Sequence, residues 1–128
     1  MGLIHAEISL NNPKRTDFCS LQVSALVDTG ALHLCIPEHL ALQLGFDLET
    51  SHQREVTTAD SKKHLCPYVG PIQVSFESRT CYTGALVLGD EVLLGAVGME
   101  DMDLILSPAK QAVTINPESP NIPSSVAK

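Results

Sequence analysis

The chain has 128 residues, 44% of them apolar and 18% charged, which is enough for one hydrophobic core and too little for two full domains. Eight lysines and arginines against fifteen acidic residues give a formal charge of −7, which argues against a nucleic-acid-binding surface. No apolar run is long enough to span a bilayer, so we expect neither nucleic-acid nor membrane partners.

The first part of the chain predicts a β-hairpin followed by a short helix. Residues 3–10 and 21–27 both alternate apolar and polar side chains with the two-residue period of a half-buried strand. Turn-forming residues lie between them, so residues 3–27 are predicted to form a hairpin. A helix over residues 37–45 follows, because proline opens this segment and glycine ends it.

The remainder predicts more short strands. Residues 53–69 are expected to form a hairpin with strands at 54–58 and 64–69 around a polar tip. The other expected elements are strands at 72–76, 81–88 and 92–95, one or two helical turns at 96–102, and a last hairpin from 104–106 and 112–115. Together, these elements predict a mostly antiparallel β domain with one or two short helices. We assign residues 1–117 to this domain and residues 118–128 to a proline-rich, flexible tail.

The number and spacing of the cysteines and histidines indicate whether a metal site is expected and in which cellular compartment the protein is expected. The four cysteines are widely spaced, with no Cys-x-x-Cys pair, and the five histidines form no metal-binding motif. We therefore expect no metal and no cofactor. A basic and apolar leader is not visible at the start of the sequence, so reduced, buried thiols and a cytoplasmic location are expected.

One motif carries chemistry: Asp28-Thr29-Gly30-Ala31, directly after a strongly apolar strand. A carboxylate next to buried β structure is unfavourable unless it is used or paired. Glycine beside it permits a sharp turn or the close approach of another backbone. Asp, Thr and Gly are also common turn residues, so the triplet by itself leaves an ordinary turn open.

In its context, the sequence resembles the retropepsin-like aspartic proteases, the single-domain branch of the pepsin clan. That family places two apolar residues before Asp-Thr-Gly-Ala, as residues 26–31 do here. Its second landmark is two apolar residues and a glycine before a short helix, here Leu93-Leu94-Gly95. A polar-tipped hairpin lies between the two landmarks, where these proteases carry a flap over the substrate. The resemblance covers residues 3–117 and implies an all-β fold closed into an acid-protease-like barrel.

The chemistry of such a site needs two carboxylates. Two adjacent carboxylates share one proton, so that one can deprotonate water while the other protonates the carbonyl oxygen. This chain has one Asp-Thr-Gly, and the second carboxylate would be Asp28 of another copy across a two-fold axis. We therefore expect an aspartic endopeptidase that acts as a homodimer on a peptide or protein substrate.

The resemblance also implies roles for single residues. Asp28 would be catalytic, while Thr29 and Gly30 would support the active-site loop and Thr29 would hydrogen-bond across the dimer interface. The terminal segments 3–10 and 112–115 would pair between subunits. The substrate-binding residues implied are Gly30, Ala31, Ala59 and Asp60.

Two departures from the family keep other functions open. Viral members follow the motif with an acidic residue that holds the substrate backbone, whereas Leu32 and His33 stand here. The hairpin tip, residues 60–63, also lacks the glycines of many viral flaps. One alternative is a weakly active or inactive pepsin-clan domain that serves as a dimerisation or peptide-binding module. A small barrel that binds an apolar ligand ranks last, because it leaves Asp28 without a role.

Overall fold

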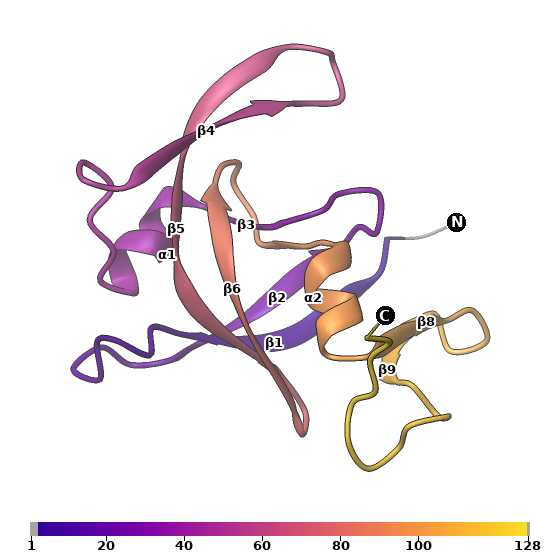
Figure 1. Cartoon of the computed structure of the whole chain (residues 1–128). Helices are drawn as coiled ribbons and strands as arrows, with labels where there is room; N and C mark the ends of the chain where they lie inside the picture. Colours follow the sequence, from indigo (N-terminus) through magenta and orange to yellow (C-terminus); the bar gives the residue numbers. More distant parts are fainter. Residues whose placement is uncertain (1–2, 128) are drawn as a thin grey trace.

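A computed structural model describes residues 3–127, in which strands dominate and the two helices are short (Figure 1). The strands are β1 (His5–Asn11), β2 (Leu21–Val27), β3 (Leu34–Ile36), β4 (His52–Thr57), β5 (Lys63–Phe76), β6 (Arg79–Val87), β7 (Leu93–Leu94), β8 (Leu104–Ser107) and β9 (Ala112–Ile115). The helices are α1 (Glu38–Gln43) and α2 (Ala96–Asp101). The predicted β domain with one or two short helices is confirmed.

One sheet contains most of the strands, in the order β1-β2-β7-β3-β6-β5-β4. Strand β1 also pairs with β5, so the pairings return on themselves and leave β4 outside the ring. Strands β2 and β7, and likewise β3 and β6, run parallel, whereas the other pairs are antiparallel. Strands β8 and β9 form a separate two-stranded sheet. The ring is compatible with the barrel expected from the family, which stays a prediction.

The core lies inside this ring of strands. Alternate residues of β1 and β5 point inward, and Ile8, Leu10, Ile72 and Val74 are at most 1% exposed. The two-residue period of the sequence therefore corresponds to burial, because only one face of each strand leaves water. Neither helix within residues 3–127 is long and apolar enough to cross a membrane.

Strand β5 differs from the prediction of two separate strands at 64–69 and 72–76. It runs without interruption from Lys63 to Phe76, and the register against β6 shifts between Val69 and Ile72. Gly70 lies in this shift, where a side chain would come 3.0 Å from the backbone of Gly84. The irregularity therefore bends one long strand instead of ending it, and the first part of β5 projects from the ring with β4 (Figure 1).

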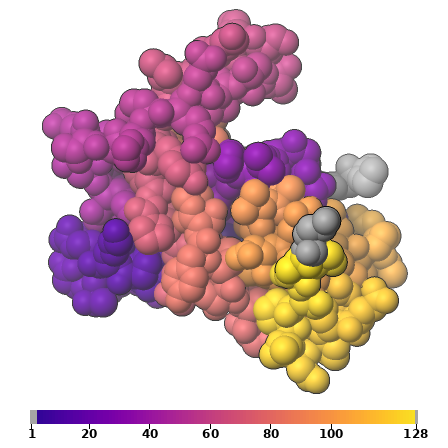
Figure 2. Space-filling model, in the orientation of Figure 1, coloured from indigo at the N-terminus to yellow at the C-terminus, as the bar shows by residue number. Residues whose placement is uncertain are grey.

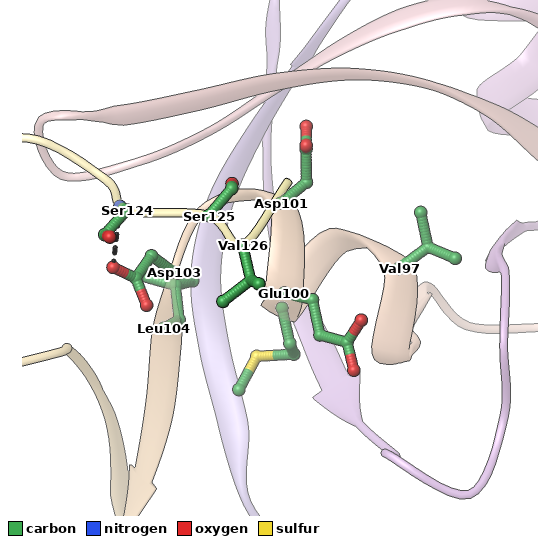
Figure 3. A pocket seen from close by; sticks show the side chains of 9 residues that line it. Val97, Glu100, Asp101, Asp103, Leu104, Ser124, Ser125 and Val126 are labelled. Carbon is green, nitrogen blue, oxygen red and sulfur yellow. Dashed lines mark hydrogen bonds between the residues drawn. The ribbon is translucent and has the colours of Figure 1, made fainter. Parts of the chain in front are cut away.

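The segment after β9 is fastened to the domain by a polar cluster around Asp103 that the sequence did not predict. The Asp103 carboxylate accepts hydrogen bonds from the Asn116 side chain, the Ser119 hydroxyl and the Ser124 backbone N–H. Figure 3 shows the hydrogen bond from Ser124. Arg79, which is 1% exposed, donates to the carbonyls of Met102 and Ser119. These contacts hold residues 119–124 near the end of α2.

The Asp103 cluster predicts an acid-sensitive stability. Hydrogen bonds from Ser119, Asn116 and Ser124 lower the pKa of Asp103 from 3.8 to about 2. Because the folded-state pKa is depressed, this stabilisation is complete above pH 3.8 and is lost as the pH falls toward about 2. The loss of this stabilisation is measured by thermal unfolding at several pH values between 6 and 2. We expect D103N to be less stable than the wild type at pH 6 and the difference to shrink in acid; a constant difference would contradict this.

Candidate active site

The Asp28-Thr29-Gly30-Ala31 loop connects β2 to β3, and its own hydrogen bonds fix the carboxylate. The Gly30 N–H donates to Asp28 Oδ1 over 2.9 Å, and the Ala31 N–H donates to the Asp28 carbonyl over 3.1 Å. The Asp28 N–H donates to the carbonyl of Leu94 over 3.0 Å. The loop is thus a tight turn anchored to β7. In the single chain the Asp28 side chain is exposed.

The second sequence landmark lies directly beside this loop. Strand β7 pairs in parallel with β2, so that Leu93 lies opposite Leu26 and Leu94 opposite Val27. The Ala96 N–H then donates to the Ala31 carbonyl over 2.8 Å. Gly95 itself is buried between these bonds.

Gly95 is needed because the loop backbone leaves no room for a side chain. A Cβ at this position would lie 2.6 Å from the carbonyl oxygen of His33 and 2.8 Å from that of Ala31. Contacts this short with backbone atoms are relieved only by moving one of the two segments. The Leu-Leu-Gly landmark therefore supports the Asp-Thr-Gly-Ala loop from behind.

A groove runs between this loop and the hairpin of β4 and β5. We call residues 52–69 the flap hairpin; it projects over the loop in Figure 1 and overhangs a hollow in Figure 2. The groove has a volume of about 650 Å³ and is lined by Asp28, residues 30–33, Cys35 and flap residues 56–59. The apolar side chains of Leu86, Leu88 and Leu93 complete it. Asp28 lies in a groove open to a peptide-sized ligand.

The structure brings four of the predicted site residues together and leaves two outside. Asp28, Gly30, Ala31 and Ala59 all line the groove. Thr29 instead lines a second cavity, of about 330 Å³, with residues of α2 and β8. Hydrogen bonding of Thr29 across a dimer interface stays a prediction.

Asp60, the other residue outside the groove, holds the flap turn. Its carboxylate accepts hydrogen bonds from the Thr58 hydroxyl and from the Lys62 backbone N–H. The Thr58 hydrogen bond is the main cause of a lowered Asp60 pKa. A side-chain cap thus closes a turn that lacks glycine, which is the usual role of aspartate in turns. Contact between the Asp60 backbone and substrate stays a prediction.

Sequence reasoning missed a cluster that joins the loop to the flap hairpin. Arg54 Nη1 on β4 lies 3.3 Å from His33 Nε2, and the Arg54 guanidinium lies 4.0 Å from the ring centre of Tyr68 on β5. The Tyr68 and His33 rings meet edge to face, with 6.1 Å between their centres. Burial, and secondly the charge of Arg54, lower the pKa of His33. No sequence signal pointed to this cluster, because it depends on how the flap strands cross the loop.

The remaining expectations concern the terminal segments, the thiols and metals. Strand β9 pairs with β8, and β1 pairs with β2 and β5, so pairing of the termini between subunits stays a prediction.

Cys66 and Cys81 are buried, but Cys19 is exposed, contrary to the expectation of buried thiols, since it lies in the loop before β2. Residues 3–127 contain no cluster of three or more His, Cys, Asp or Glu side chains that would hold a metal ion.

An Asp-Thr-Gly-Ala loop backed by Leu-Leu-Gly and covered by a hairpin is the arrangement of the aspartic proteases. The chain belongs to the aspartyl protease family, whose model matches residues 14–111. The fold is similar to the crystal structure of a retropepsin-like aspartic protease from Rickettsia conorii. That similarity has a TM-score of 0.54 at 21% sequence identity and covers 75% of this chain and 70% of the other. No curated protein matches the sequence. Family and fold together support a peptide hydrolase at the general level.

Proposed function

We propose that this chain is an aspartic endopeptidase whose active site forms between two copies, each contributing Asp28. The observation that carries the proposal is the position of the Asp28 carboxylate, in the groove under the flap hairpin and within a loop fastened at both ends. Its exposure in the single chain leaves space for a second carboxylate to approach. A two-fold axis beside Asp28 would bring identical loops face to face.

The proposed reaction uses the two carboxylates as one unit with one shared proton. The ionised Asp28 takes a proton from water as the water oxygen attacks the peptide carbonyl, and the protonated Asp28 gives its proton to the carbonyl oxygen. The tetrahedral intermediate collapses when the newly protonated Asp28 gives its proton to the leaving nitrogen, the C–N bond breaks, and the other Asp28 carboxylate takes a proton from a hydroxyl of the intermediate to re-form the carbonyl. The polar groups of the groove would hold the peptide in place during both steps, and Gly30 leaves room for the substrate backbone.

A peptide-binding module with little or no hydrolysis is the second candidate. The observation that favours it is the replacement of the acidic residue of viral relatives by Leu32 and His33, which removes one means of holding the substrate backbone. This candidate predicts peptide binding in the same groove without turnover.

Mixing subunits tests the shared site. We expect that titrating D28N chains into a fixed amount of wild-type chain lowers peptide cleavage toward zero, because wild-type subunits are drawn into mixed dimers with one carboxylate. Sedimentation velocity on the same mixtures measures the dimer. Cleavage that stays constant during the titration, or a protein that sediments as a monomer while it cleaves, would contradict the shared site. Peptide binding without cleavage by the wild type would favour the second candidate.

A further inference from the structure

The groove has an uneven distribution of charge. Much of its lining is apolar and includes Ala31, Leu86, Leu88 and Leu93. The ionisable side chains that line it include those of Asp28 and His33, and Arg54 lies beside His33. A peptide in this groove would therefore contact apolar side chains and, beside His33, come near the guanidinium of Arg54.

Arg54 is not one of the residues that line the groove, but it places a positive charge beside His33, which does line it. Its guanidinium is placed by two contacts, to His33 Nε2 at 3.3 Å and over the Tyr68 ring at 4.0 Å, yet the residue is exposed. No carboxylate among residues 3–127 lies within ion-pair distance of Arg54. Guanidinium carries five N–H donors in a planar fork. Most of them are thus free for a ligand.

The neighbouring charges do not neutralise Arg54. Glu55, the next residue of β4, forms its ion pair with Lys63 over 3.7 Å, and consecutive residues of a strand point to opposite faces. Because Arg54 Nη1 donates to His33 Nε2, the imidazole is the neutral acceptor in this contact. An oriented and unpaired guanidinium is the arrangement that recognises a carboxylate through two parallel hydrogen bonds.

We propose that Arg54, positioned by His33 and Tyr68, forms a carboxylate-recognising subsite, so that the substrate is a peptide with apolar residues at the cleavage point and an acidic group to one side. The inference rests on the proposed function, because it names the substrate class of that site. The overall charge of −7 would otherwise repel acidic peptides, so recognition depends on this local group.

A glutamate scan tests the subsite through binding. Acetylated and amidated peptides with a central apolar pair carry one Glu, or Gln at the same position, moved along the peptide. Binding is measured by fluorescence anisotropy on D28N, which keeps the groove but should not cleave, and cleavage is measured on the wild type. We expect one position at which Glu binds about fivefold to tenfold more tightly than Gln. A second set with a free C-terminus distinguishes a terminal carboxylate from a side chain.

Variants of Arg54 test whether this side chain causes the preference for Glu over Gln. R54Q in the D28N background should abolish the preference for Glu, R54K should retain part of it, and R54E should favour Lys at the same position. R15Q is the matched control, because Arg15 is also exposed and also lies over an aromatic ring, that of Phe18, in the loop between β1 and β2. Its removal should leave the preference unchanged.

The outcomes separate the inference from the proposed function. A preference for Glu that disappears in R54Q supports the subsite even if the wild type cleaves no peptide. In that case only the proposed hydrolysis is rejected, and the subsite stands. Cleavage without any preference for an acidic position, or a preference that survives R54Q, overturns the subsite and leaves the hydrolysis intact.

Discussion

Replacing Asp28 with asparagine is expected to reduce peptide cleavage by about a hundredfold to ten thousandfold, the range attributed to general acid–base catalysis. The amide has the shape of the carboxyl group but cannot take a proton from water. The local fold should survive, because an amide oxygen can still accept the hydrogen bond from the Gly30 N–H. Cleavage assays at mildly acidic pH measure the loss, circular dichroism verifies that the fold persists, and sedimentation compares the D28N and wild-type chains for the proposed dimer.

The matched control for this substitution is D90N. Asp90 is exposed in the turn before β7 and lies outside the groove, so its loss should leave cleavage within about twofold, as is usual for surface positions. Equal activity of D28N and wild type would exclude Asp28 as the catalytic residue. A defect of equal size in D90N would mean that charge, and not position, is responsible.

The G95A substitution is expected to give the largest loss of stability. Its methyl group would meet the carbonyl oxygens of His33 and Ala31 at 2.6 and 2.8 Å, and backbone cannot rotate away as a side chain can. We expect the free energy of unfolding to fall by about 2–3 kcal/mol, as in overpacked cores. Cleavage should fall as well, since the displaced segment carries Asp28. Urea denaturation and cleavage at saturating peptide measure the two effects.

G98A provides the comparison for G95A. Gly98 lies in α2, where a methyl group would meet the Leu94 side chain at 2.7 Å, and a side chain can adopt another rotamer. Alanine also favours helix over glycine by up to about 1 kcal/mol. We therefore expect little net change in stability and unchanged cleavage. If G98A were as damaging as G95A, the backbone contact would not be the cause.

Much of the fold could be predicted because its elements have a clear period. The alternation in residues 3–10 and 21–27 leads to the observed hairpin of β1 and β2, and proline and glycine mark the two ends of α1. The family resemblance marked Leu93-Leu94-Gly95 as a second landmark, but the adjacency of Gly95 and the Asp28 loop is seen only in the structure. Periodicity cannot supply it, since it does not say which strands pair across the sheet.

The parts that escaped prediction depend on contacts between distant residues. Arg54 and Tyr68 lie in strands that were predicted, but their meeting with His33 follows from the curvature of the flap hairpin over the loop. The attachment of residues 119–124 follows from Asp103, an aspartate without a local pattern. Neither interaction has a spacing rule, because each joins segments that the chain brings together only on folding.

The bonds between the Asp28 loop and the segment after β7 have a consequence for the order of events during biosynthesis. The loop is synthesised before the groups that hold it, because Leu94, Ala96 and Val97 follow it in the sequence. A nascent chain that has reached α1 already contains Asp28 but lacks its support. The geometry of the site is therefore acquired only after the flap hairpin has been synthesised.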